Sequence, residues 1–267
     1  MANELNFDDT GTGSPAITFV HGLACALEDW RSQVATLSPD RRCLSVDLPG
    51  HGASPAGGPL AIERFGRSVA DTVRDVGACP TVLVGHSMGC RVVLEAAQRL
   101  GDEVVGVVLV DGSLRGAGDA HTARSQTRAA IEAVGFETYV TGLFDAMFTA
   151  GSDAALREQI VGRALRLDAA AGTGLIADLA AWDAGRMETV LRATRTPVFV
   201  IQSTGVDVGG KRVSLEPGQS TPFVDKVLEC LPDTRIEVIP GIGHFTMHEA
   251  AAQVSGLLAE FVAEVSA

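Results

Sequence analysis

Gly85-His86-Ser87-Met88-Gly89 is the stretch of this sequence that decides the fold. It follows the apolar run 81–84 and precedes a stretch of helical periodicity at 91–100. In this context Gly-x-Ser-x-Gly predicts a very tight strand-to-helix turn, which holds the serine hydroxyl free at the tip of the strand. The two glycines leave room for strand and helix to approach closely, and the helix N-terminus directs N–H groups at the reacting atom. The pentapeptide therefore predicts that Ser87 is a nucleophile.

Apolar runs alternate with helical patterns on both sides of this motif. Near-continuous apolar strands separated by helices are typical of a parallel sheet that is covered on both faces. We therefore expect an α/β fold. The expected strands are 16–20, 43–46, 81–85, 104–110, 197–201 and 235–239, and the expected helices are 62–76, 87–100 and about 247–265.

The segment 114–196 lacks a clear strand pattern. An insertion of this size at one edge of a sheet is typical of a helical cap over the strand ends. We therefore expect a core domain made of residues 1–113 and 197–267, and a cap made of residues 114–196. The alanine-rich sequence of the cap predicts about four helices, at 122–134, 137–149, 153–168 and 174–192.

Composition restricts the class of protein. A chain of 267 residues is long enough for one α/β domain with an insertion. The formal net charge of −12 argues against nucleic acid and anionic membranes as partners. The five cysteines are scattered without a Cys-x-x-Cys pair, and neither a signal peptide nor a membrane-length apolar run is evident. We expect a cytoplasmic protein that acts on a small molecule, and we make no prediction of its oligomeric state.

Four motifs together resemble the α/β-hydrolase family over nearly the whole chain. They are His21-Gly22 after the first central strand, the glycine- and proline-rich loop 47–54, the turn at Ser87, and Gly243-His244-Phe245 after the last strand. The resemblance implies the α/β-hydrolase fold of serine esterases, a mostly parallel sheet flanked by helices. It also implies a helical cap that is inserted after the strand ending at Asp111, and no cofactor.

The chain departs from the family pattern in two places. Only one strand, around residues 4–8, is expected before the first central strand, where the family usually has two. Cys90 stands where a second glycine often follows the serine turn. Cysteine is small enough to pack under the helix, and we expect it to be buried and inert.

His244 is the best candidate for the base that Ser87 needs, because a serine hydroxyl is a weak nucleophile at neutral pH. Its loop follows the last strand and returns to the sheet edge that carries Ser87. His248 lies four residues later, but no acidic or cysteine partner has ligand spacing, so we expect no metal site. The other histidines lie beside motif glycines, in a loop or in the cap: His21, His86, His51 and His121.

Two aspartates follow strands at the edge where His244 is expected. Either could accept a hydrogen bond from its ring and stabilise the imidazolium. Asp111 directly ends the strand 104–110, although it could instead be a turn residue. Asp207 follows the strand 197–201, where most of the family carries its acid, although its loop is long and it could simply be exposed. We favour Asp111, with Asp207 as the alternative acid; Asp47 is expected to brace the loop after its own strand.

The resemblance also implies an oxyanion hole. Its donors are the N–H groups of Met88, directly after the serine, and of Leu23, directly after His21-Gly22. Each such donor lowers the barrier by about 3 kcal/mol. The cap aromatics could line a pocket or pack on one another. The candidate pocket residues are His21, Gly22, His86, Phe144, Phe148, Trp182 and Phe245.

The combined prediction is a serine hydrolase that cleaves a carboxylic ester or related acyl bond of a small, hydrophobic substrate through an acyl-enzyme. The same three groups would serve a carbon–carbon bond hydrolase or a lactonase. The fold would also serve a cofactor-free lyase or oxygenase, or a non-catalytic ligand-binding protein. The acidic composition disfavours an anionic substrate unless Arg115, Arg124 or Arg128 faces the pocket.

Overall fold

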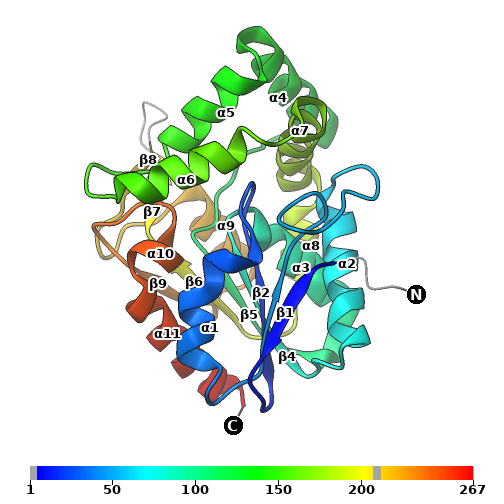
Figure 1. Ribbon diagram of the computed structural model, residues 1–267, viewed down its shortest axis with the longest axis vertical. Coiled ribbons are helices and arrows are strands. Elements are labelled where there is room, and N and C mark those ends of the chain that lie inside the picture. Colours follow the sequence, from blue (N-terminus) through cyan, green and yellow to red (C-terminus); the bar gives the residue numbers. More distant parts are fainter. Residues whose placement is uncertain (1–4, 207–211, 267) are drawn as a thin grey trace.

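The computed structural model describes residues 5–206 and 212–266, in which seven strands form one sheet (Figure 1). Their order is β1-β3-β2-β4-β5-β6-β9. Only β1 pairs antiparallel with its neighbour, and the other pairs in this sheet are parallel. The mostly parallel α/β sheet is therefore confirmed. The strands are β1 (Phe7–Thr10), β2 (Ala16–Val20), β3 (Cys43–Val46), β4 (Thr81–His86), β5 (Val104–Val110), β6 (Val198–Gln202) and β9 (Arg235–Val238).

Helices cover both faces of the sheet. In Figure 1, α1 (Arg31–Leu37) and α11 (Ala251–Val265) lie on one face, and α2 (Ile62–Asp75) and α3 (Met88–Leu100) lie on the other. Every residue of β2, β3, β4 and β6 is buried, as expected for strands that are covered on both sides. The structure also contains two short 3-10 helices, Leu27–Trp30 before α1 and Gly101–Glu103 between α3 and β5.

The contact between α2 and α3 fixes the helix that carries Ser87 at its start. Ile62, Phe65, Val69 and Val73 recur at helical spacing on α2 and are fully buried. A Cβ atom at Gly66 would lie 2.3 Å from the Cβ of Glu95 on α3, so glycine lets the two helices approach.

The segment between β5 and β6 folds into five helices, where the sequence predicted about four. The expected helix 174–192 is divided at Arg186, whose backbone leaves the helical conformation. The side chains of Asp119, Asp153 and Asp168 cap three of these helices, which explains where they begin. The helices are α4 (Ala120–Val134), α5 (Phe136–Asp145), α6 (Ala154–Ala164), α7 (Ala169–Gly185) and α8 (Met187–Ala193).

Helices α4 to α7 lie beyond one end of the sheet (Figure 1). Two buried contacts hold α7 against α3. Arg91 forms an ion pair with Asp183, with the closest N···O distance 2.7 Å, and Trp182 donates its indole N–H to Glu95 at 2.7 Å. The helical segment is thus packed onto the helix that begins after Ser87.

Other elements differ from the sequence predictions or were not predicted. β1 lies at Phe7–Thr10, later in the chain than the expected 4–8, and the expected C-terminal helix is divided at Ala250 into α10 (Thr246–Glu249) and α11. The hairpin β7 (Thr204–Val206) and β8 (Arg212–Ser214) and the helix α9 (Pro222–Cys230) were not predicted. The hairpin strands have three residues each and are partly exposed, so they carry little periodic signal.

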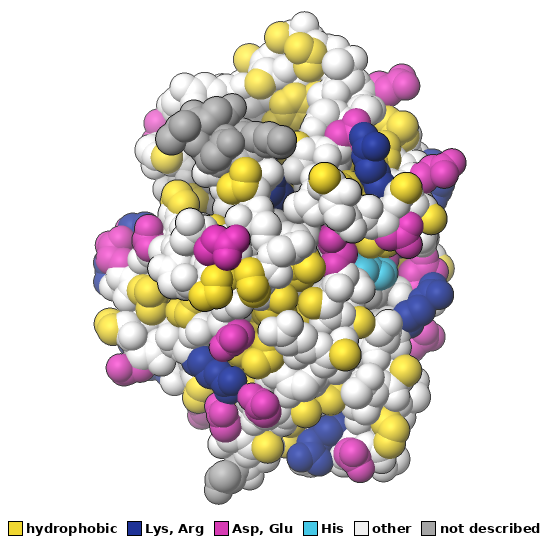
Figure 2. Space-filling view, turned by 90° about the vertical axis from the view of Figure 1, so that its left-hand side faces the viewer, with side chains coloured by type: hydrophobic (Ala, Val, Ile, Leu, Met, Phe, Trp, Pro, Cys, Tyr) yellow, Lys and Arg dark blue, Asp and Glu magenta, His cyan; other side chains and the backbone are white. Residues whose placement is uncertain are grey.

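The remaining features are the charge of the surface, the lengths of the helices and the pairing of the cysteines. On the face that Figure 2 shows, acidic and basic side chains are scattered among uncharged ones. Over residues 5–206 and 212–266, no helix has both the length and the apolar character needed to cross a bilayer. The five cysteines are all unpaired.

Candidate active site

Ser87 is the single residue between the end of β4 and the start of α3. Its φ and ψ are 53° and −110°, a strained conformation for a residue with a side chain. A Cβ at Gly85 would lie 2.3 Å from the carbonyl oxygen of Gly89, and a Cβ at Gly89 would lie 2.5 Å from that of Val20. Both glycines of the motif are therefore required by close backbone approach.

Three non-glycine residues of the described chain have a positive φ, and all three lie in this turn or in the loops beside it. They are Ala24 (55°), Ser87 (53°) and Asp111 (44°). Such conformations cost free energy and tend to cluster at functional sites. Strain is thus concentrated where β2, β4 and β5 end.

The structure brings Ser87, His244 and Asp111 together. His244 Nε2 lies 2.8 Å from Ser87 Oγ, and His244 Nδ1 lies 2.5 Å from Asp111 Oδ2. The imidazole therefore bridges the hydroxyl and the carboxylate through its two nitrogens. The alternative acid, Asp207, lies outside the described residues.

Asp111 is held by a dense set of donors. Its Oδ1 accepts the N–H groups of Ser203 and Thr204, both at 2.8 Å, and its Oδ2 accepts the Thr204 hydroxyl at 2.6 Å. Burial opposes ionisation, but the hydrogen bond and charge of His244, together with Arg212 and Thr204, outweigh it and lower the pKa of Asp111 to about 2. The carboxylate is therefore ionised at neutral pH and can stabilise a protonated His244.

His244 is neutral at the same pH. Burial lowers its pKa to about 4, the Arg212 charge acts in the same direction, and Asp111 opposes both only in part. Because Asp111 accepts from Nδ1, the proton is on Nδ1 and the lone pair of Nε2 faces the Ser87 hydroxyl. In this state the imidazole can accept the hydroxyl proton.

Two contacts position the His244 loop. The backbone N–H of His244 donates to the carbonyl oxygen of Met147 at 2.9 Å. The ring Nε2 of His86 donates to the backbone carbonyl oxygen of His244, also at 2.9 Å. Burial, with the neighbouring His244, lowers the pKa of His86 to about 3, so this ring is neutral. His86 thus supports the backbone of the His244 loop. Phe245, the next residue of this loop, stacks on Phe148, with 4.9 Å between the ring centroids.

The expected oxyanion donors lie beside Ser87. Leu23 and Met88 line the same cavity as Ser87, and a Cβ at Gly22 would lie 3.3 Å from the Cβ of Ser87. Over the part of the chain that the structure describes, neither the Leu23 nor the Met88 N–H donates a hydrogen bond. Both are therefore available to a ligand.

The cavity at Ser87 has a volume of about 20 Å³, room for about one water molecule. None of the seven pocket residues predicted from the sequence is among the residues that line it, whereas the two oxyanion candidates Leu23 and Met88 are. His21 instead accepts the Leu48 N–H at 3.0 Å, and Trp182 is engaged with Glu95. The lining also does not include the other five predicted residues, which are Gly22, His86, Phe144, Phe148 and Phe245. The lining residues are Leu23, Ser87, Met88, Arg91, Ser113, Arg115, Leu143, Met147, Ile176, Leu179 and Arg212.

Sequence reasoning did not place Arg91 and Arg212 at this cavity. Arg91 lies one helical turn after Ser87, and that spacing was the one signal that could have found it. Arg212 begins a strand that was not predicted. The sequence disfavoured an anionic substrate unless one of three arginines faced the pocket. Arg115 does line the cavity, whereas Arg124 pairs with Asp178 and is not among the lining residues.

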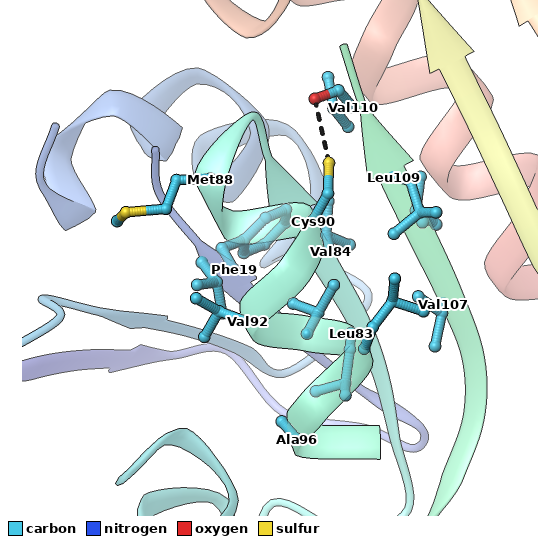
Figure 3. Close-up of a cluster of buried hydrophobic side chains, with 14 of the residues drawn as sticks. Phe19, Leu83, Val84, Met88, Cys90, Val92, Ala96, Val107, Leu109 and Val110 are labelled. Atoms are coloured by element: carbon cyan, nitrogen blue, oxygen red, sulfur yellow. Dashed lines mark hydrogen bonds between the residues drawn. The ribbon is translucent and has the colours of Figure 1, made fainter. Parts of the chain in front are cut away.

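Two other expectations concern residues around the turn. Asp47 accepts the N–H groups of Leu27 and Ala53, so it braces the loop after β3. Cys90 lies under the turn among apolar side chains, with Sγ 3.5 Å from the carbonyl oxygen of Val110 (Figure 3). Burial raises the pKa of this thiol to about 12, and a protonated thiol is a poor nucleophile.

The structure also bears on metal binding. Within residues 5–206 and 212–266, no group of three or more His, Cys, Asp or Glu side chains is placed to hold a metal ion. His248 instead lies 3.0 Å from the buried carboxylate of Asp29, which also pairs with Arg163.

Known proteins match this chain in sequence and in fold. The model of a family described as "Alpha/beta hydrolase family" matches residues 19–257. The chain is 33% identical over 108 residues to sn-1-specific diacylglycerol lipase ABHD11 of Mus musculus, a match to 40% of this chain and 35% of that protein. It is 30% identical over 165 residues to 2-succinyl-6-hydroxy-2,4-cyclohexadiene-1-carboxylate synthase of Enterobacter sp. (strain 638), a match to 57% of this chain and 64% of that protein. These matches span less than two thirds of the relatives' lengths.

Among solved structures, a thermophilic esterase from Thermogutta terrifontis superposes with a TM-score of 0.78. The superposition covers 98% of this chain and 93% of the esterase, at 22% sequence identity. At that identity the likeness describes the fold alone.

Proposed function

Because the chain belongs to the alpha/beta hydrolase family, we propose that it is a serine hydrolase that cleaves an ester or related acyl bond through an acyl-enzyme. One observation carries this proposal. The hydroxyl of Ser87, the ring of His244 and the carboxylate of Asp111 form one hydrogen-bonded chain, with distances of 2.8 and 2.5 Å. This arrangement is what activation of a serine requires.

In the first half of the reaction, Ser87 Oγ attacks the carbonyl carbon of the substrate while His244 Nε2 takes the hydroxyl proton. A carbon–oxygen bond forms, and the carbonyl oxygen becomes an oxyanion that the N–H groups of Leu23 and Met88 bind. The intermediate then expels the alcohol, which leaves with the proton from His244. Asp111 stabilises the imidazolium throughout.

In the second half, a water molecule attacks the acyl-enzyme and gives a proton to His244. The bond between the acyl carbon and Ser87 Oγ breaks, His244 returns the proton to the serine, and the carboxylic acid is released. Every step uses groups of this chain and water.

We assign residues 1–113 and 197–267 to the core and residues 114–196 to a cap over Ser87. Leu143 and Met147, in and just after α5, and Ile176 and Leu179 in α7 form an apolar wall of the cavity. Since the cavity holds about one water molecule, a substrate binds only after these side chains move. The apolar wall suits an apolar acyl or alcohol group. The unpaired cysteines suit a reducing compartment such as the cytoplasm.

A fluorophosphonate probe tests this mechanism, because it reacts with a serine only when a neighbouring base activates it. Intact-protein mass spectrometry should show one adduct on the wild type and on Ser68→Ala, a serine of α2 outside the cavity. Ser87→Ala should carry no adduct and hydrolyse no ester, while its circular dichroism stays unchanged. Hydrolysis that survives in Ser87→Ala would disprove the acyl-enzyme.

The similarity to the Enterobacter synthase favours a second candidate function, because that protein's name describes a synthase rather than an esterase. In such a reaction His244 would remove a proton from the substrate and Ser87 would form no ester. The two candidates predict different results. If the chain catalyses this lyase-type reaction, rapid quenching during turnover should find no acyl group on Ser87. If it is a serine hydrolase, the acyl-enzyme should accumulate.

A further inference from the structure

Three guanidinium groups line the small cavity that holds Ser87: those of Arg91, Arg115 and Arg212. Among the lining residues that the structure describes, none is an aspartate or a glutamate. This is unexpected in a chain whose formal net charge is −12. Arg91 is buried, whereas Arg115 and Arg212 are partly exposed. Because arginine is rarely buried without a partner, the partner of each group bears on what the cavity can hold.

Arg91 is fully engaged within the protein. Its Nε and Nη2 each lie 2.7 Å from a carboxylate oxygen of Asp183, and Nη2 also donates to the carbonyl oxygen of Ser113 at 2.6 Å. Both side chains of the ion pair are buried. A bidentate pair of this kind is strong and rigid, so Arg91 braces the cavity wall.

Arg212 is only partly compensated. Its Nη1 donates to the Thr204 hydroxyl at 2.6 Å and lies 3.6 Å from Asp111 Oδ2. That oxygen already accepts hydrogen bonds from Thr204 and His244. Burial lowers the pKa of Arg212, and Asp111 offsets this only in part.

Arg115 carries the unmatched charge. Its backbone N–H donates to Asp183 at 2.7 Å, and its guanidinium donates to the Tyr139 hydroxyl at 3.4 Å. Over residues 5–206 and 212–266 its guanidinium forms no ion pair. Within residues 5–206 and 212–266, the carboxylates that pair with these three guanidinium groups are those of Asp111 and Asp183, which leaves one positive charge in excess among the described residues.

We propose that the substrate carries a carboxylate that binds Arg115, with Arg212 beside it, next to the bond that Ser87 attacks. This inference rests on the proposed hydrolase function and names its substrate class. A substrate anion would supply the missing negative charge, and a guanidinium binds a carboxylate through two parallel N–H donors. Because the same small cavity contains Ser87 and the oxyanion donors, the carboxylate lies within a few carbons of the scissile carbonyl.

The electrostatics of the base agree with this placement. The charges of Arg212 and Arg115 both hold the pKa of His244 down, so both act at the reaction centre. A bound anion would partly cancel them. A cavity lined both by arginines and by apolar side chains suits a substrate with one charged end and one apolar end.

A matched pair of esters tests the inference. 4-Nitrophenyl hemiglutarate ends in a carboxylate, and 4-nitrophenyl pentanoate is a neutral ester with an acyl chain of the same carbon number. The wild type should have the higher kcat/KM on the anionic ester. Arg115→Met should lose about 10- to 100-fold in kcat/KM on that ester, the effect of removing a hydrogen bond to a charged group, and less than about 3-fold on the neutral one.

Two further variants serve as controls. Arg124→Met removes another cap arginine, which pairs with Asp178 away from the cavity, and should leave both esters unaffected. Arg115→Lys keeps the charge but not the paired donors, so it should restore part of the preference even if Arg115→Met unfolds. Equal loss on both esters in both Arg115 variants, or a wild-type preference for the neutral ester, would overturn the inference.

A binding measurement separates the two proposals if neither ester is a substrate. Monomethyl glutarate, an anion, should slow fluorophosphonate labelling of Ser87 more than the neutral dimethyl glutarate does, and Arg115→Met should abolish the difference. Equal protection by the two compounds would refute carboxylate binding alone. If Ser87 is not labelled at all and neither ester is cleaved, the hydrolase proposal itself fails.

Discussion

Arg212 acts on the carboxylate of Asp111 both directly, at 3.6 Å, and through the hydroxyl of Thr204. The guanidinium donates to Thr204, and Thr204 donates to the same Asp111 oxygen that accepts the ring N–H of His244. The guanidinium of Arg212 therefore lies at the Asp111 end of the hydrogen-bonded series that runs from Asp111 through His244 to Ser87. It stabilises the ionised form of Asp111 and disfavours protonation of His244.

The pH dependence of hydrolysis should reflect this charge. The base acts only when it is unprotonated, so activity rises with pH through the pKa of His244, which is lowered to about 4 from its usual 6.5. We expect kcat/KM on a neutral ester to be retained at pH 5 to 6 and lost as the pH falls through about 4.

Variants of the surrounding charges check that assignment. The titratable or charged groups around His244 are Asp111, Arg212, Arg115 and His86. Arg212→Met removes a positive charge, which raises the pKa of His244 and moves the acid limb to higher pH. An acid limb near 6.5 that is the same in wild type and variant would contradict this account of the base.

Asp111→Asn should reduce kcat by about 10⁴-fold, because an amide neither fixes the ring tautomer nor stabilises the imidazolium. Steady-state kinetics on an activated ester measure the loss, and an unchanged thermal unfolding midpoint excludes misfolding. Asp207→Asn is the matched comparison and should change kcat by less than about tenfold, the level of a residue outside the triad. A larger loss in Asp207→Asn would identify Asp207 as the acid instead.

Gly89→Ala should destabilise the protein, because the added Cβ would lie 2.5 Å from the backbone oxygen of Val20. The three nearest atoms all belong to the backbone, so no flexible side chain can move aside. We expect the free energy of unfolding to fall by about 3 kcal/mol, the upper range for an overpacked core. Urea unfolding measures it. Gly256→Ala on the exposed side of α11 meets no atom within 4 Å and should stabilise the helix by about 0.5–1 kcal/mol. Equal effects at both positions would refute the packing argument.

Asp183→Ala should be strongly destabilising, because it leaves Arg91 buried without its partner. Breaking a buried ion pair costs about 3–5 kcal/mol. The exposed pair of Arg192 and Glu188 provides the comparison, and Glu188→Ala should cost less than about 1 kcal/mol. Both losses are measured by urea unfolding. If Arg91→Met restores the stability of Asp183→Ala, the loss came from the unpaired charge; if it does not, lost packing between α3 and α7 is responsible.

Patterns that lie within a few neighbouring residues predicted much of the fold. All six apolar runs became strands within one residue of their expected ends, since burial on both faces demands continuous apolar sequence. The run at 81–85 became β4, and the glycines around Ser87 meet backbone atoms that belong to the same turn or to the neighbouring strand. The short partly exposed hairpin of β7 and β8 has no such pattern. The break between α7 and α8 lies at Arg186, which pairs with the distant Glu95 of α3.

The sequence by itself therefore determined the parallel sheet, the turn that presents Ser87 and the candidate base His244. Only the tertiary structure decided which groups meet there. The hydrogen bond of His244 to Asp111 joins residues 133 positions apart, and the pair of Arg91 with Asp183 joins residues 92 positions apart. The meeting of Arg115 and Arg212 at one cavity likewise depends on how the segment between β5 and β6 and the hairpin of β7 and β8 pack against the sheet. Local periodicity encodes which face of an element is buried, but not which distant charge it will face, because that depends on the packing of the whole chain.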